Sequence, residues 1–130
     1  MATVLTNLGR AAISNRLANG MTQPDLRYIA WGTGSGTSAV TDTAMFTEAA
    51  EARTAGAMTQ QTTSVTNDTY QVDGFITAIA DRQITEMGIW DTAKAQSGTP
   101  TGNLVVHGDF AVINLASGDS LNFTVKIQFQ

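Results

Sequence analysis

The sequence predicts a mainly β fold, a β-sandwich or jelly roll with one helix near the N-terminus. From residue 56 onward, threonine-rich stretches alternate with turn dipeptides such as Asp73-Gly74 and Gly118-Asp119, a pattern typical of consecutive strands. The final stretch, 121–129, alternates apolar and polar residues, as a strand with one buried face does. Before residue 56, one segment has a clear helical periodicity.

The predicted helix lies close to the N-terminus. Its apolar residues recur at steps of three to five: Leu5, Leu8, Ala12 and Leu17. Thr6 or Asn7 can cap its start and Gly20 can close its end. Gly9 inside the segment costs up to about 1 kcal/mol relative to alanine, so we expect this helix to depend on packing. Residues 21–26 follow as a turn.

Four further segments have the composition of strands, rich in branched and aromatic residues. They are residues 27–31, 70–80, 83–90 and 104–115. The last is longer than most strands, so Gly108-Asp109 is expected to form a bulge or a break between two strands.

The chain is long enough for one domain, residues 1–130. We expect it to comprise a helix and arm, residues 1–55, and a β-sandwich, residues 56–130. Residues 32–37 are glycine-rich and predict a loop. Residues 41–53 allow either a short helix or an extended arm.

Composition excludes several classes of function. The net charge is −4 and the seven basic residues are scattered, so nucleic acid is not an expected partner. No apolar run is long enough for a bilayer and no secretory signal is visible, so no membrane partner is expected. With no cysteine and one histidine, neither disulfides nor the usual zinc sites are available. We expect no metal and no cofactor.

Two local patterns suggest chemistry, but both have simpler interpretations. The glycines of residues 32–37 lack the Lys-Ser/Thr pair of a phosphate-binding loop and favour a tight turn or flexible loop. His107 and Asp109 share a strand face and could orient a general base, yet no nucleophile motif accompanies them. Glu48 and Glu51 would form a solvated stripe if their segment were helical. We therefore expect a chain that is not an enzyme and has no catalytic residues.

Three aromatic residues are candidates for an interface. Trp31 and Trp90 each close a predicted strand, and core packing is the simpler role for both. Tryptophan is also favoured at the centres of interfaces, which leaves the second role open. Phe46, in the arm, is the third interface candidate.

The order of motifs resembles a phage structural family, the domain at the head of tail-collar fibre proteins and of related small virion proteins. The most specific piece is Ile84-Thr85-Glu86-Met87-Gly88-Ile89-Trp90-Asp91, followed by Gly102-Asn103-Leu104. The other pieces are Leu5-Thr6-Asn7 with Gly9, Ile29-Ala30-Trp31-Gly32-Thr33-Gly34, and Thr43-Ala44-Met45 with Glu48 and Arg53. Met45-Phe46 and the alanine-rich residues 49–52 depart from the third of these.

Within the most specific motif, Glu86 presents a physical problem. In a strand it shares its face with Ile84 and Gly88, so its carboxylate needs a partner. That partner is either Arg53 or a set of backbone N–H groups. Our hypothesis is that Arg53 and Glu86 form a structural pair that fixes the arm to the sheet.

The resemblance implies a virion structural protein made in the bacterial cytoplasm. No fibre shaft follows Gln130, which favours a capsid decoration or cement protein on the outer surface of the head over a tail fibre, baseplate or tail-tip component. The implied partners are the major capsid protein and further copies of the chain, as a dimer or trimer. The helix and residues 41–66 are the candidates for these contacts.

Overall fold

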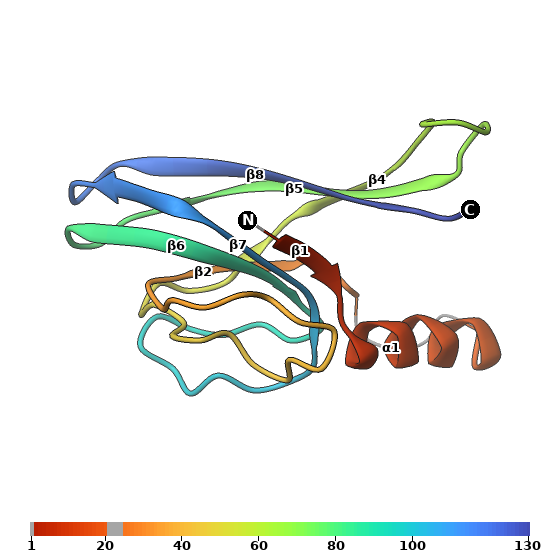
Figure 1. Ribbon diagram of the computed structural model, residues 1–130, viewed down its shortest axis with the longest axis horizontal. Helices are drawn as coiled ribbons and strands as arrows, with labels where there is room; N and C mark the ends of the chain where they lie inside the picture. Colours follow the sequence, from red (N-terminus) through yellow and green to blue (C-terminus); the bar gives the residue numbers. More distant parts are fainter. Residues whose placement is uncertain (1, 21–24) are drawn as a thin grey trace.

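The strands form two antiparallel sheets in the computed structural model, which describes residues 2–20 and 25–130 (Figure 1). The larger sheet has the order β1-β7-β6-β2-β3 and the smaller sheet the order β4-β5-β8. The elements are β1 (Ala2–Leu5), α1 (Asn7–Ala18), β2 (Tyr28–Gly32), β3 (Thr54–Ala55), β4 (Ala57–Gln61), β5 (Thr69–Thr77), β6 (Arg82–Trp90), β7 (Leu104–Leu115) and β8 (Ser120–Gln128). The prediction of a mainly β sandwich with an N-terminal helix is confirmed.

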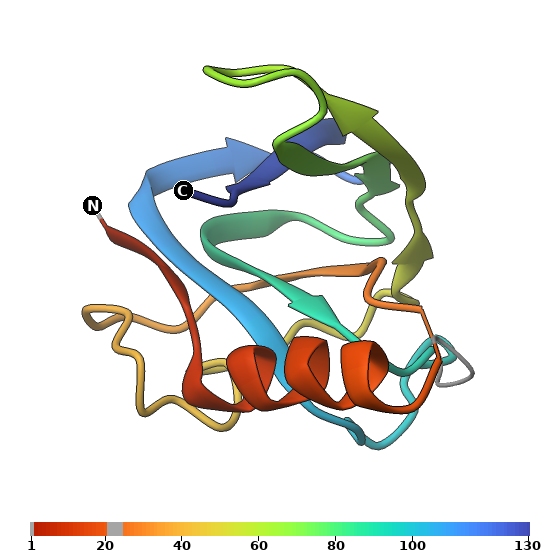
Figure 2. The same ribbon diagram turned by 90° about the vertical axis from the view of Figure 1, so that its right-hand side faces the viewer.

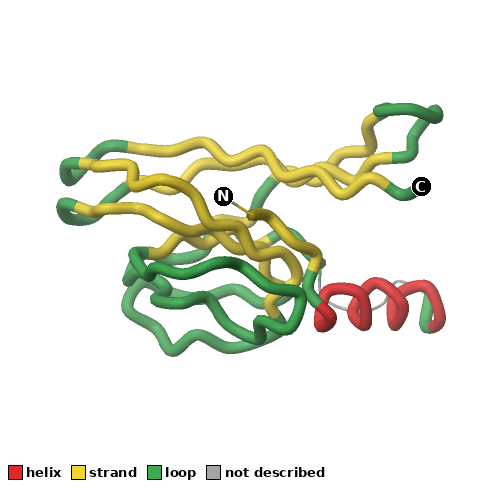
Figure 3. Tube along the Cα trace, in the orientation of Figure 1, coloured by secondary structure: helices red, strands yellow, loops and turns green. Residues whose placement is uncertain are grey.

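Three tight connections carry the chain between the sheets, the first of them at Gly56 between β3 and β4. Residues 78–81 join β5 to β6, and residues 116–119 join β7 to β8. The two sheets stack on each other, as Figure 2 shows. Between them, β5 approaches β2 and β3, and the rings of Phe110 and Phe123 meet between β7 and β8 with centroids 6.4 Å apart. A third layer, made of loops 33–53 and 91–103, covers the other face of the larger sheet (Figures 1 and 3).

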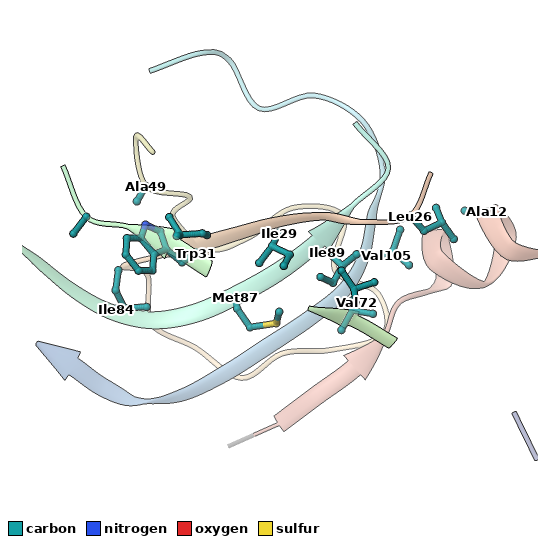
Figure 4. Close-up of a cluster of buried hydrophobic side chains, with 13 residues drawn as sticks. Ala12, Leu26, Ile29, Trp31, Ala49, Val72, Ile84, Met87, Ile89 and Val105 are labelled. Carbon is teal, nitrogen blue, oxygen red and sulfur yellow. The ribbon is translucent and has the colours of Figure 1, made fainter. Parts of the chain in front are cut away.

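The larger sheet is buried on both faces, so two apolar clusters form. Figure 4 shows the cluster between the sheets, where Ile29, Met87 and Ile89 project from the larger sheet and Val72 from the smaller one. The second cluster lies under the loop layer and contains Ala30, Met45, Trp90 and Leu104. Neighbouring residues of β2 thus point into different clusters, which explains its uninterrupted apolar sequence.

Most predicted strands are confirmed. The segments at 27–31, 70–80, 83–90 and 121–129 correspond to β2, β5, β6 and β8. Of the two alternatives at Gly108-Asp109, the break is wrong, because β7 is one continuous strand. The bulge is confirmed, since the pairing of β7 with β6 shifts register between Asp109 and Ile113. The sequence did not predict β1, whose four residues form a strand by pairing with β7.

The expected division at residue 55 does not follow the layers. Strands β1, β2 and β3 all precede residue 56, yet they belong to the five-stranded sheet. Pairing over long sequence separations decides this, since Leu5 lies opposite Val106. Residues 41–53 contain no helix; of the two alternatives, they form the arm, which consists of turns and bends. The turn expected at 21–26 falls largely on residues 21–24, which lie outside the described residues.

The helix begins as predicted, but a different side of it is buried. Thr6 caps it, accepting a hydrogen bond from the backbone N–H of Gly9 at 2.9 Å. Leu17 is 71% exposed and Leu5 belongs to β1, so the predicted apolar stripe is wrong at both ends. The buried residues are Gly9, Ala12 and Arg16.

Close approach explains which side faces the sheet. A Cβ atom on Gly9 would lie 2.4 Å from the carbonyl oxygen of Val105, closer than real contacts allow. Only glycine lets the helix rest on β7 there.

Among the described residues, no helix is long and apolar enough to cross a membrane.

We predict that Gly9→Ala destabilises the protein, although alanine favours helix by about 1 kcal/mol. The added methyl group would force α1 away from β7. Urea unfolding monitored by circular dichroism measures the change, and Ser14→Ala, at an exposed position of the same helix, is the control. A gain in stability from Gly9→Ala equal to that of the control would contradict the packing argument.

Candidate functional site

A buried carboxylate on the central strand of the larger sheet organises the loop layer. Glu86, on β6, is fully buried. Its Oε2 accepts hydrogen bonds from the backbone N–H of Thr47 at 2.7 Å and of Gly34 at 3.1 Å. Its Oε1 accepts from the backbone N–H of Phe46 at 2.9 Å and contacts His107 Nε2 at 2.8 Å. One side chain thereby fixes both ends of the segment 34–47.

His107 connects this carboxylate to a second one. The imidazole is fully buried, and its Nδ1 lies 2.7 Å from Asp42 Oδ2 while its Nε2 faces Glu86. Because both ring nitrogens face carboxylate oxygens, the geometry favours the doubly protonated imidazolium, which donates from both. The ring of Phe46 packs on it with centroids 4.8 Å apart.

The pKa values shift in the directions that keep this network charged. Burial alone would raise the pKa of Glu86, but hydrogen bonds from His107 and from three backbone N–H groups outweigh it and lower that pKa. Burial alone would lower the pKa of His107, but its hydrogen bonds to Glu86 and Asp42 raise it. The site therefore holds the imidazolium of His107 against the carboxylate of Glu86.

Asp109, two residues after His107 on β7, binds loop 33–53 at a further point, Ser38. Its carboxylate accepts hydrogen bonds from the backbone N–H of Ser38 at 2.7 Å and of Ala2 at 3.2 Å. The hydrogen bond from Ser38 is the main reason that its pKa is lowered. The spacing of His107 and Asp109 allowed a contact between them, but Asp42 reaches the histidine instead.

The glycine-rich loop is a close-packed element of this site. Cβ atoms on Gly32 and Gly34 would lie 2.7 and 2.8 Å from Glu86 Oε2. At Gly34 the same atom would also lie 2.4 Å from the Cβ of Phe46. The structural interpretation of the glycines is confirmed, and the reason is backbone approach to a carboxylate of the same chain rather than to a phosphate.

Arg53 organises the other end of the loop layer. Its guanidinium binds both carboxylate oxygens of Glu48, each at 3.0 Å, and donates to the carbonyl oxygens of Thr92 at 2.7 Å and Thr101 at 2.8 Å. Its Cζ lies 3.9 Å from the centroid of the Trp90 ring, in cation–π geometry. Arg53 thus ties loop 33–53 to loop 91–103.

The predicted Arg53–Glu86 pair is therefore wrong. Glu48 lies in the arm, five residues before Arg53, and presents both oxygens to the planar guanidinium. Glu86 is satisfied by the alternative partner, a set of backbone N–H groups, together with His107. The two residues do fix the arm to the sheet, at separate points.

Lys94 and Asp91 complete the loop layer. Lys94 Nζ donates to the carbonyl oxygens of Ala49 at 3.3 Å and Glu51 at 2.9 Å. Asp91 accepts from the backbone N–H of Asn103 at 2.8 Å and from its side-chain amide at 2.9 Å. These hydrogen bonds lower the pKa of Asp91 against the opposing effect of burial. Both ends of loop 91–103 are closed in this way.

The carboxylates of Glu48 and Glu51 do not form a solvated helical stripe. Glu48 binds Arg53, while Glu51 binds Arg82 Nε at 2.8 Å and is 5% exposed. Burial opposes ionisation of Glu51, but hydrogen bonds led by the one from Arg82 lower its pKa. Glu48 thus pairs within the arm, and Glu51 joins the arm to β6.

The aromatic interface candidates divide into two kinds. Trp31 is 1% and Trp90 2% exposed, so both are core residues and neither is available as an interface anchor. Phe46 is 36% exposed and covers the imidazole of His107. Only Phe46 of the three offers surface to a partner.

The arrangement can hold loops but offers little to a substrate. His107 is sealed from solvent, and both of its ring nitrogens are occupied. An apolar hollow of about 270 Å³ lies elsewhere, at the far end of the smaller sheet, and its lining has no acid or histidine. Within residues 2–20 and 25–130, no group of three His, Asp or Glu side chains could hold a metal ion.

Sequence reasoning located Glu86 and Arg53 but missed Asp42, Lys94 and Asp91 as members of the site. Glu86 could be found because a carboxylate on a central strand demands donors. Nothing local marks Asp42, which is one acid in a polar stretch and reaches His107 from 65 residues away.

Comparisons with known proteins give no relative for this fold and site. No protein-family model, no curated protein and no solved structure matches the chain.

We predict that Glu86→Gln destabilises the protein by about 3 kcal/mol or more, because the imidazolium would lose its buried counter-ion and one amide cannot accept every hydrogen bond. Denaturant unfolding measures the loss. Asp25→Asn, which neutralises an exposed acid, is the matched control and should change stability little. Equal stability of Glu86→Gln and the control would overturn the role given to this carboxylate.

We also predict a loss of stability as pH rises above about 6.5. The pKa of His107 is raised from 6.5 in the folded chain, so its contribution is complete below that value and is lost as pH rises through the folded pKa. The pKa of Glu86 is lowered from 4.5, so its contribution is lost as pH falls below that value.

His107 is the sole histidine, so the alkaline loss can be assigned to it. Melting temperatures across the pH range should show the loss in the unmodified chain, and His107→Gln should remove it while lowering stability at pH 6. An unchanged alkaline profile in His107→Gln would show that another group causes the loss.

Proposed function

We propose that the chain is a bacteriophage virion structural protein, a capsid decoration or cement protein that binds the outer surface of the assembled head and stabilises contacts between coat subunits. The carrying observation is that the residues of the phage-like motif 84–91 all serve packing or loop anchoring. Ile84 is in the core, Glu86 anchors the arm, and Asp91 closes loop 91–103. Gly88 allows close contact with Leu104 and Met45.

The same assignment fits how charge is distributed. Arg53, Glu86 and Lys94 are bonded within the loop layer. The outer face of the smaller sheet is mainly polar and also carries the exposed Phe75; its polar residues are Gln71, Asp73, Asn122, Thr124 and Lys126. Surfaces of this kind suit extended, hydrogen-bonded contact with another protein. A protein that binds only the assembled lattice stabilises that lattice by mass action.

The resemblance to the head domain of tail-collar fibres supports a second location, in a tail fibre, baseplate or tail tip. Both locations use the fold as a rigid unit in an assembly. They differ in the partner, which is the coat lattice in one case and tail proteins in the other.

We expect the chain to co-sediment saturably with heads of the phage that encodes it, after minor proteins are stripped, and to raise their heat resistance. Phe46→Asp is the matched surface variant and should weaken binding if the arm contacts the coat, whereas Arg10→Glu, on the exposed side of α1, serves as its control. Recovery with tails would move the assignment to the second location, and absence from purified virions would overturn it.

A further inference from the structure

His107 donates to two carboxylates that differ in their access to water. Its Nε2 lies 2.8 Å from Glu86 Oε1, and its Nδ1 lies 2.7 Å from Asp42 Oδ2. The side chain of Glu86 is 0% exposed, whereas that of Asp42 is 19% exposed. An imidazolium that loses one proton keeps a single N–H, so the neutral ring donates to only one of the two carboxylates. Their difference in exposure decides which contact is lost.

Glu86 has no replacement for the N–H of the histidine. A ring without a proton on Nε2 would place a lone pair 2.8 Å from Glu86 Oε1, and this repulsion between two buried acceptors would not be screened by water. Three backbone N–H groups of the arm hold the same carboxylate in place, so it is not free to turn away. The proton on Nε2 is therefore the one that the neutral ring keeps.

Asp42 is better able to lose its contact, because it lies in a turn at the end of the arm. We call residues 39–42 the arm tip. The backbone N–H of Asp42 donates to the carbonyl oxygen of Ala39 at 3.0 Å, and Asp42 Oδ2 accepts from the N–H of Ala39 at 2.8 Å. The tip also binds the start of α1, since Val40 accepts from the N–H of Asn7 at 2.7 Å. A partly exposed carboxylate that turns outward exchanges a protein partner for water at little cost.

The surroundings of His107 contain one further acid. Asp109 lies two residues along β7 and is itself bonded to backbone N–H groups. The residues opposite His107 on the neighbouring strands are uncharged: Gly88 on β6 and Val4 on β1. From the arm, the ring of Phe46 covers the imidazole. Within the described part of the chain, the ion-pair contacts of the imidazole are therefore those with the two carboxylates.

We infer that the arm tip is a pH-dependent switch: imidazolium His107 holds it closed, and it opens when Nδ1 releases its proton to solvent while Nε2–H stays on Glu86. Because the pKa of His107 is raised from 6.5, the tip is held below about that pH and is released as the pH rises through the folded pKa. A general loss of stability would accompany either neutral tautomer, whereas the switch requires the one protonated at Nε2. The inference uses only contacts within the chain and does not rest on the virion assignment.

The tautomer of His107 tests the switch in the unmodified chain. Since this is the sole histidine, isotope-labelled histidine gives one pair of ring-nitrogen signals in an NMR titration. We expect Nδ1 to lose its proton with rising pH while Nε2 keeps its own. A neutral ring protonated at Nδ1 would overturn the proposal, and so would a ring that stays doubly protonated until the protein unfolds.

Amide hydrogen exchange tests whether the arm tip moves. Protection factors, corrected for the intrinsic effect of pH on exchange, should fall about tenfold or more at Ala39, Asp42 and Asn7 as the ring loses its proton. The amides that bind Glu86 lie in the same arm and serve as the internal control, because they should keep their protection. Unchanged protection at the tip, or an equal loss at the control amides, would contradict a switch confined to the tip.

Two variants show whether the histidine is the group that responds to pH. His107→Gln should make the protection of the arm tip independent of pH. Asp25→Asn, which neutralises an exposed acid, is the matched control and should leave the pH dependence as it is. Persistence of the pH dependence in His107→Gln would assign the switch to another group and overturn the proposal. The ring signals and the exchange of the unmodified chain decide the matter even if His107→Gln does not fold.

Discussion

The loop layer of this protein depends on one constraint: a carboxylate placed on a buried central strand must be surrounded by donors. Leaving Glu86 ionised without partners would cost several kcal/mol, so the sheet is stable only when donors are brought to it. Here they come from backbone N–H groups of the arm and from His107. A segment with no regular secondary structure thereby becomes a fixed layer.

That constraint explains why β6 is the organising strand. One of its faces carries Met87 and Ile89 into the core between the sheets, while the other presents Glu86 and Trp90 to the loops. The first face is held by apolar burial and the second mainly by charge-assisted hydrogen bonds.

The sequence allowed prediction of whatever depends on local pattern. The alternation in β8, the capping of α1 by Thr6 and the need of Glu86 for donors were all visible. Features decided by distant pairing were not: β1 is a strand because β7 lies beside it, and Asp42 acquires its role only where the arm crosses His107. Glu86 shows the limit of pair reasoning, since its need for a partner was clear but Arg53 and a set of backbone N–H groups were both eligible, and Arg53 binds Glu48 instead.

The layers also determine where this molecule can meet another. Loops 33–53 and 91–103 cover one face of the larger sheet, and the smaller sheet covers the other, so neither face of the larger sheet is available. Within the part of the chain that the structure describes, the accessible surfaces include the outer face and edges of the smaller sheet, the edge strand β1, the exposed side of α1 and the surface of the loop layer near Phe46. The buried charges are already bonded internally. Binding of a partner protein at these surfaces must therefore come mainly from backbone groups at strand edges, from hydroxyl groups and from a few exposed apolar side chains, rather than from long-range electrostatic attraction. Contacts of that kind depend on shape and register, and the rigid loop layer and the regular strand β8 provide both.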